Sequence, residues 1–340
     1  MGRLNTIEEQ LSTLKWASAY CKPQVGLVDV TSVSELRLFF GEELRLYFAL
    51  SALSRSTTAP KQMVNDALAL VFRVRVILEQ TIIEKYSQMM ERSGLRALEL
   101  QRQPLHGYSN KQGVSIRMPL SSCVPTKVCG SACYAHDVLD AAPASVIRGA
   151  VNGAIASRFE LSNAEERSEL LGALHRPILR MIGAARKDAQ ASASTFKRRP
   201  RVRFAHVGEF TAFPEYANAL ARLVHIHSDG DVDCVVYTRH PDAKLLDPNL
   251  FVVLFSLDES SEDRRRFVPP TAWVVRSAFG GHVTDSVDVN FLEHHRWIHI
   301  KPVGTGKICP STAPETKVRT CDACQCDFCF KPKVIPLVPA

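Results

Sequence analysis

The cysteines of this chain are concentrated in two short segments, which strongly limits how those segments fold. Eight of the ten cysteines lie in them. The first segment separates its three cysteines by five and then three residues, and the second lies near the C-terminus. Scattered cysteines are core residues by default, whereas dense groups indicate metal binding or redox chemistry. The groups are Cys123, Cys129 and Cys133, and then Cys309, Cys321, Cys324, Cys326 and Cys329.

The N-terminal sequence and the hydropathy pattern predict a cytoplasmic protein with no membrane partner. Residues 1–20 have the pattern of an amphipathic helix and lack the apolar core and cleavage site of a signal peptide. The longest apolar stretch, around residues 67–78, is interrupted by Arg73 and Arg75. Thiols stay reduced in the cytoplasm, so we expect the cysteine groups to bind metal rather than form disulfides.

The composition allows a packed core and mildly favours an anionic partner. Hydrophobic residues make up 46% of the chain, which excludes wholesale disorder. The formal net charge is +7, and a positive charge favours nucleic acid or a nucleotide as partner. An ordinary basic protein without such a partner fits the same charge equally well.

Residues 1–105 are predicted to form a helical region. Ser32 and Glu35 have the spacing of a capping box, and Pro60 and Gly94 bracket a long amphipathic segment. The apolar stripe of that segment is most simply a core face, and docking of a partner or dimerisation is the other interpretation. A polar stretch at residues 101–113 is taken as the domain boundary.

Residues 113–305 alternate short β-type runs with helix-type runs, which predicts parallel βαβ units. No G-x-G-x-x-G sequence opens any of the helices, so we expect an open or partial (β/α) barrel, resembling a TIM barrel, rather than a dinucleotide-binding sheet. The expected strands are 113–120, 201–207, 232–240, 251–260, 272–278 and 296–302, and the expected helices are 143–159, 162–186 and 214–225.

Residues 306–340 are rich in proline and cysteine and have little core-building periodicity. Such a segment is normally held together by metal. We therefore expect a C-terminal metal-binding segment, with Cys309 available to replace one of the four closely spaced thiols.

The residues that follow the expected strands form the candidate site. Chemistry in (β/α) barrels is carried by loops at the carboxyl ends of the strands. The first strand leads into the three-cysteine loop, and the next ones end in HVGEF, YTRH and SLDES. The predicted catalytic or substrate-contacting residues at these ends are Glu209, Tyr237, Arg239 and Asp258.

This order of motifs resembles the radical S-adenosylmethionine enzymes. In that family a three-cysteine loop after the first strand holds a [4Fe–4S] cluster, whose fourth iron binds S-adenosylmethionine. A Gly-Gly-Glu segment after the second strand contacts the methionine amino group. The resemblance implies that Cys123, Cys129 and Cys133 hold a cluster, and that Gly208 and Glu209 bind the cofactor.

The chain also resembles a phage and mobile-element family named after gene product 88 of a mycobacteriophage. The similarity covers the C…C…CYA loop, an Arg-x3-Asn helix, an R-x-x-H-x-G-E-F strand end and the YTR strand end. It implies a phage or plasmid setting. The helix and strand-end residues are candidate contacts for substrate or nucleic acid, namely Arg148, Asn152, Arg203 and His206.

Three functions remain open from the sequence. The first is an iron–sulfur enzyme acting on nucleic acid, a nucleotide or a peptide, with a second cluster or zinc at the C-terminal cysteines. The second follows from Cys324–Cys329, which resembles the zinc motif of tRNA-guanine transglycosylases and implies base exchange in DNA with Asp258 or Glu209 as nucleophile. The third is a non-enzymatic, zinc-stabilised nucleic-acid-binding protein, because zinc also prefers thiolate ligands.

Overall fold

The structure is a computed structural model of the chain. It describes residues 143–191, 199–278, 282–292 and 302–309, most positions of 105–126, residue 129, and scattered positions between 76 and 91. Some of the elements expected from the sequence fall outside these residues. Outside them lie residues 1–75, all but the last residue of the expected strand 296–302, Cys133, and the C-terminal cysteines Cys321, Cys324, Cys326 and Cys329.

The described strands form one seven-stranded sheet whose spatial order follows the chain order, β1 to β7. The strand β1 pairs antiparallel with β2, and every later pairing from β2 to β7 is parallel. The α/β class predicted from the sequence is confirmed. The strands are β1 (Gly107–Ser109), β2 (Gly113–Ile116), β3 (Arg201–Phe204), β4 (Asp233–Thr238), β5 (Phe251–Leu257), β6 (Trp273–Ala278) and β7 (Val289–Leu292).

Alternate residues of the strands belong to two different apolar clusters, one on each face of the sheet. Val236 and Phe255 belong to the large cluster that also contains the helix residues. Val235, Leu254 and Val275 belong to a smaller cluster on the opposite face. We call the first face the helix face and the second the inner face. All seven residues of β5 are buried, as expected for the middle of a parallel sheet covered on both sides.

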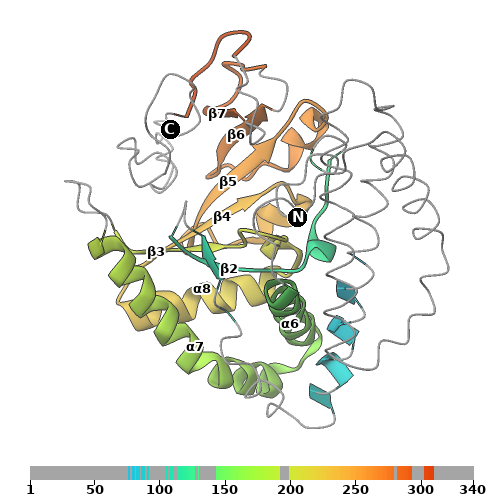
Figure 1. Cartoon of the computed structure of the whole chain (residues 1–340), viewed down its shortest axis with the longest axis vertical. Helices are drawn as coiled ribbons and strands as arrows, with labels where there is room; N and C mark the ends of the chain where they lie inside the picture. Colours follow the sequence, from blue (N-terminus) through green and yellow to red (C-terminus); the bar gives the residue numbers. More distant parts are fainter. Residues whose placement is uncertain are drawn as a thin grey trace, which may run out of the picture.

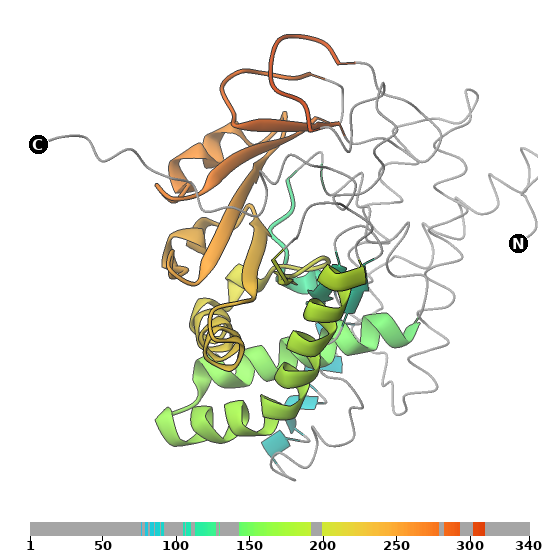
Figure 2. The same cartoon turned by 90° about the vertical axis from the view of Figure 1, so that its left-hand side faces the viewer.

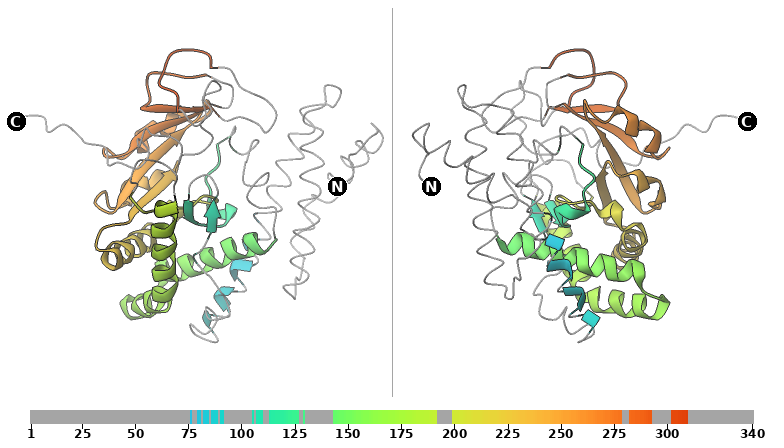
Figure 3. Two further views of the ribbon diagram at one scale, coloured as in Figure 1. Left: turned by 60° about the vertical axis from the view of Figure 1, so that its left-hand side comes forward. Right: turned by 90° about the vertical axis from the view of Figure 1, so that its right-hand side faces the viewer.

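Three helices cover the helix face beside β2, β3 and β4. They are α6 (Pro143–Leu161), α7 (Ala164–Ala191) and α8 (Pro214–Ser228). Figure 1 shows them gathered beside the first parallel strands while β5, β6 and β7 extend beyond them. The turned views in Figures 2 and 3 show the same arrangement. The short 3-10 helices η5 (Pro241–Leu245) and η6 (Glu262–Phe267) connect β4, β5 and β6.

The described part of the N-terminal region shares the core of the sheet. The described positions between 76 and 91 are helical, and Ile82 and Met90 are buried in the large cluster. A methyl group on Gly153 of α6 would lie 3.3 Å from Ile83 Cδ1, so this helix packs closely on α6. Ile82, the one residue of the predicted apolar stripe whose side chain the structure describes, is buried in this core.

Two sequence-based boundaries differ from the structure. The polar stretch 101–113, taken as a domain boundary, contains β1, in which Tyr108 pairs with Val114 of β2. The segment Val289–Leu292 forms β7 although no strand was expected there. Residues 302–309 continue the sheet beside β7 through a parallel bridge between Asn290 and Ile308. Among the described helices, none is both long and apolar enough to cross a membrane.

Candidate functional site

The three-cysteine loop begins where β2 and β3 continue side by side past their last paired residues. Met118 N donates to the Val207 carbonyl oxygen (2.9 Å), and His206 N donates to that of Ile116 (3.2 Å). Gly208 has a φ of +76°, and a methyl group on it would lie 2.5 Å from the Met118 carbonyl carbon. Only glycine fits this left-handed position and this close approach without strain.

The chain then turns through the 3-10 helix η2 (Leu120–Ser122), which is held from two sides. Ser121 N donates to Glu79 Oε2 (2.9 Å), a carboxylate oxygen from the N-terminal helical region. Ser122 Oγ accepts a hydrogen bond from Glu209 N (2.8 Å). Cys123 follows directly and is half-buried. The first cysteine and the predicted cofactor residue Glu209 are thus joined through one serine.

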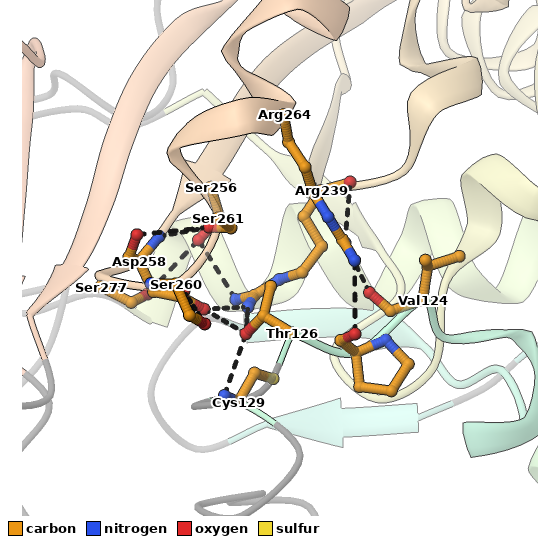
Figure 4. A network of polar contacts seen from close by, with 11 residues as sticks. Val124, Thr126, Cys129, Arg239, Ser256, Asp258, Ser260, Ser261, Arg264 and Ser277 are labelled. Carbon is orange, nitrogen blue, oxygen red and sulfur yellow. Dashed lines mark hydrogen bonds and ion pairs between the residues drawn. The ribbon is translucent and has the colours of Figure 1, made fainter.

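The middle of the loop is attached to the ends of β4 and β5 by Thr126. Its hydroxyl donates to Asp258 Oδ2 and accepts from Cys129 N (3.0 Å). Arg239 Nη1 lies 3.4 Å from the same hydroxyl and forms an ion pair of 2.9 Å with Asp258 Oδ2. Figure 4 shows these groups converging from the loop and from both strand ends. Through its backbone, Cys129 is therefore held next to the Arg239–Asp258 pair.

Asp258 is fully buried, and both of its carboxylate oxygens accept hydrogen bonds. Oδ2 accepts from Thr126 and Arg239, while Oδ1 accepts from the backbone and the hydroxyl of Ser260 (both 2.9 Å). Burial raises the pKa of the Asp258 carboxyl, but the hydrogen bonds from Thr126 and Ser260 and the charge of Arg239 outweigh it. The pKa is lowered from its ordinary value, so the group is a carboxylate at neutral pH.

A second arginine holds the backbone of the loop. Arg264 of η6 donates from Nη1 to the Val124 carbonyl oxygen (2.7 Å) and from Nη2 to that of Pro125 (3.3 Å). Arg264 Nη1 also lies 3.5 Å from the Arg239 carbonyl oxygen. Figure 4 shows this guanidinium approaching the loop from the side opposite Cys129. The planar fork of arginine suits two neighbouring carbonyl groups in this way.

Glu209 is a buried carboxyl beside the loop. Thr211 Oγ1 donates to Glu209 Oε1 (2.9 Å), and the side chain is 5% exposed. Burial raises the pKa of the Glu209 carboxyl, and hydrogen bonds from Thr238 and Thr211 with the charges of His240 and Arg239 offset only part of the rise. A cationic group brought next to Glu209 would favour its ionised form.

Three further residues of the predicted site, Arg203, Tyr237 and His206, lie on the inner face of the sheet. The guanidinium of Arg203 lies over the ring of Tyr237, 4.4 Å from its centroid. His206 Nδ1 lies 2.8 Å from Ser115 Oγ and 3.3 Å from the Ile116 carbonyl oxygen. Burial and the positive charges of Arg117 and Arg203 lower the pKa of His206 to about 3, so the ring is neutral at physiological pH.

The Arg-x3-Asn pair of α6 supports the end of β2. Asn152 is fully buried and donates from Nδ2 to the Arg117 carbonyl oxygen (2.8 Å). A methyl group on Gly149 would lie 2.8 Å from Arg117 Nε, which shows how closely the helix approaches. Burial and the charge of Arg117 lower the pKa of Arg148. Asn152 therefore fixes the backbone from which the cysteine loop departs.

The described cysteines fit a thiolate site in chemistry but do not complete one. Cys123 and Cys129 are half-buried on the anchored loop, whereas Cys309 is buried in the inner-face cluster beside β7. Its backbone N donates to the Asn290 carbonyl oxygen (2.8 Å). Within the described residues, no group of three His, Cys, Asp or Glu side chains is placed to hold a metal ion. Cys133 and the four C-terminal cysteines lie outside them.

Sequence reasoning missed the residues that anchor the loop. Arg264 belongs to a charged run, EDRRRF, which has the composition of a solvated turn. Glu79 lies 44 residues before Cys123 on a helix with no visible link to the loop. Thr126 carried a local signal, because a threonine three residues before Cys129 has the spacing of a helix cap.

Comparison of the chain with protein-family models, curated proteins and solved structures found no match. The functional interpretation therefore rests on the residues and contacts described above.

Proposed function

We propose that this chain is an iron–sulfur enzyme with the organisation of the radical S-adenosylmethionine enzymes. In this proposal the sheet is a partial (β/α) barrel, and Cys123, Cys129 and Cys133 hold a [4Fe–4S] cluster. The substrate is a nucleic acid, nucleotide or peptide in a phage or mobile-element setting. The C-terminal cysteines, with Cys309, hold a second cluster or zinc.

The observation that best supports the proposal is the attachment of the cysteine loop to three successive strand ends. Ser122 contacts the backbone of Glu209 after β3, and Thr126 contacts Arg239 after β4 and Asp258 after β5. Enzymes built from parallel βα units place their reactive groups at this edge of the sheet. A loop that served only to connect β2 to α6 would not need side chains from other elements to hold it. Four such side chains contact this loop, namely Glu79, Arg239, Asp258 and Arg264.

Two features support the barrel organisation. The strand order follows the chain order without a reversal, as it does in barrels and unlike in doubly wound sheets. Tyr237 of β4 and Phe291 of β7 meet on the inner face, with ring centroids 6.4 Å apart. Strands three positions apart are separated by about 14 Å in a flat sheet, so a curved inner face accounts for this contact.

The residues around the loop suit a thiolate-bound cluster. A [4Fe–4S] cluster supplies one-electron chemistry when bound, and cysteine thiolates are its usual protein ligands. Cys123 and Cys129 are half-buried, so their thiols are partly shielded from solvent. Thr126 fixes the backbone at Cys129, while η2 fixes it at Cys123. Both anchors restrict the positions that the two thiols can adopt.

In the proposal, Glu209 orients S-adenosylmethionine through the amino group of its methionine part. The buried carboxyl has a raised pKa, so it gains most from a cationic partner. Arg239 and Asp258 hold the loop and form one wall of the site. Tyr237, which lies on β4 two residues before Arg239, lines the substrate end in this proposal.

The contacts of Asp258 weigh against base exchange with this residue as the nucleophile. Both oxygens are engaged by Thr126, Arg239 and Ser260, and the side chain is fully buried. A nucleophilic carboxylate needs an oxygen that can reach the substrate. Glu209, the other candidate nucleophile, is also buried and accepts hydrogen bonds from Thr211 and Thr238.

Reductive cleavage of S-adenosylmethionine tests the proposed activity. The anaerobically purified protein, given a chemical reductant and S-adenosylmethionine, is expected to release methionine and 5′-deoxyadenosine. Glu209→Gln is expected to raise the KM for S-adenosylmethionine, with Glu215→Gln on the exposed start of α8 as the control. A protein that contains its cluster and releases no methionine would refute this activity.

A further inference from the structure

We propose that the inner face of the sheet below the cysteine loop binds a mononucleotide, with its phosphate at Arg203 and its base on the aromatic side chains of Trp273 and Phe291. The inference rests on the proposed function only in treating this ligand as the substrate. The binding itself is independent of which metal the cysteines hold.

Arg203 is placed as an anion-binding residue. Its partner in register on β4 is Val235, which belongs to the inner-face cluster, so Arg203 projects to the inner face. The guanidinium lies over Tyr237, 4.4 Å from the ring centroid. Stacking of this kind fixes the plane of an arginine and leaves its edge donors available for oxygen atoms of phosphate.

One hydrogen-bond donor of Arg203 is buried and needs an acceptor. Arg203 Nε is buried, and the described residues provide it with no hydrogen-bond partner. Those residues also place no carboxylate in an ion pair with Arg203. A buried donor without an acceptor costs about 1–3 kcal/mol, which a ligand oxygen would recover. This differs from Arg239, whose charge is matched by Asp258.

The electrostatic surroundings of Arg203 favour an anion. Arg117, which is buried, and Arg203 both lower the pKa of the His206 ring that lies between β2 and β3, after the larger effect of burial. Arg117 likewise lowers the pKa of Arg148 on α6. Arg117 and Arg203 therefore both lie close to the neutral imidazole of His206, at the ends of β2 and β3.

An aromatic surface lies on the same face within reach of Arg203. Tyr237, Leu254 and Trp273 are register partners across β4, β5 and β6, so they form one row on the inner face. Phe291 contacts Tyr237 from β7, and all three aromatic residues are only partly buried around the apolar cluster. Bases stack on such side chains. Arginine beside aromatic rings favours a nucleotide over an acidic peptide, which has no planar ring to stack.

Binding of adenosine 5′-monophosphate and cytidine 5′-monophosphate to the metal-containing full chain tests the inference. Adenosine, inorganic phosphate and an Asp-Glu dipeptide serve as partial probes in the same calorimetric titration. We expect a nucleoside monophosphate to bind at least about tenfold more tightly than adenosine or phosphate alone, because charged hydrogen bonds and stacking both contribute.

Two variants separate the two parts of the ligand. Arg203→Met keeps the apolar stem but removes the donors, and it is expected to weaken nucleotide binding about ten- to a hundredfold while adenosine binding is unchanged. Phe291→Leu keeps the apolar volume and is expected to weaken nucleotide and adenosine binding alike, by about fivefold or more. Arg222→Met, on the exposed surface of α8, is the matched control.

The outcomes are distinct. The inference would be overturned if nucleotide binding were unchanged in Arg203→Met, or if adenosine bound as tightly as its monophosphate. It would also be overturned if the protein bound the dipeptide more tightly than a nucleotide, or bound no nucleotide. A protein that holds zinc instead of iron but binds nucleotide through Arg203 would refute the proposed function and leave this inference standing.

Discussion

Arg239 and Asp258 form an ion pair of 2.9 Å between the carboxyl ends of β4 and β5. The same oxygen, Asp258 Oδ2, also accepts a hydrogen bond from the hydroxyl of Thr126. The Arg239 side chain is 15% exposed and that of Asp258 is fully buried. The pair thus joins two strand ends to the middle of the three-cysteine loop. The pair positions the backbone of Cys129 through Thr126 and does not contact the thiol directly.

Replacement of Asp258 by Asn is expected to destabilise the protein by about 3–5 kcal/mol, because it leaves the Arg239 charge without its buried partner. The amide would also direct donors toward Thr126 and Arg239, which need an acceptor. Chemical denaturation measures the loss, and metal analysis of the folded fraction is expected to show reduced metal content. Asp263→Asn, on the exposed surface of η6, is the control and should leave both quantities unchanged.

Replacement of Thr126 by Val removes the hydroxyl that links the loop to Asp258 and to Cys129 N. The expected loss of unfolding free energy is about 1–3 kcal/mol, and bound metal should be lost faster to a chelator. Thr126→Ser keeps the hydroxyl and should behave like the unmodified chain. Equal chelation rates for the Val and Ser variants would show that this hydroxyl does not position the loop.

Replacement of Gly208 by Ala is expected to cost at least about 2 kcal/mol, because the new methyl group meets the Met118–Pro119 backbone at a positive φ. Gly183→Ala tests the opposite case, since no atom lies within 4 Å of its added methyl group on α7. That variant is expected to be neutral or stabilised by up to about 1 kcal/mol. Thermal or urea unfolding of both variants measures the contrast.

The neutral, buried His206 predicts a specific dependence of stability on pH. Its pKa is about 3 in the folded state and about 6.5 when unfolded, so the unfolded state binds more protons between these values. Stability from this group is complete above pH 6.5 and decreases as the pH falls, by about 2–3 kcal/mol at pH 4.5. His206→Gln should reduce the slope of unfolding free energy against pH over this range.

The strands that could be predicted from the sequence are those with long apolar runs. FVVLFSL and DCVVYT are rich in β-branched and aromatic residues, so β5 and β4 were expected almost at their observed bounds. The strand β7 was missed because VNFL is short and lies among acidic and polar residues. The strand β1 was missed because its glycine and serine resemble a linker, and only pairing with β2 makes it a strand.

The sequence predicted the capped start of α7 correctly, but it placed the capping residue one position too early. Ser162 and Glu165 predicted the start of α7, but the cap is Asn163, whose Oδ1 accepts from Glu166 N (3.0 Å). Ser162 Oγ instead donates back to the Arg158 carbonyl oxygen (2.8 Å) at the end of α6. Two neighbouring residues of similar capping ability cannot be separated without the geometry of the preceding turn.

The order of the candidate site residues was readable from the sequence, but their contacts were not. Glu209, Arg239 and Asp258 each follow a strand, as expected from the sequence pattern. That Arg239 pairs with Asp258 depends on the register of β4 against β5, in which Thr238 lies beside Phe255. The role of Arg264 depends on the path of a loop that no periodicity specifies.

The metal content of the protein tests the central claim most directly. The chain is purified without oxygen, and iron, acid-labile sulfide and zinc are assayed per chain beside the visible spectrum. The same assays follow for the variant with Cys123, Cys129 and Cys133 all changed to Ala. We predict a brown protein with about four iron and four sulfide at this site, lost in the triple variant. A colourless protein containing only zinc would contradict the account.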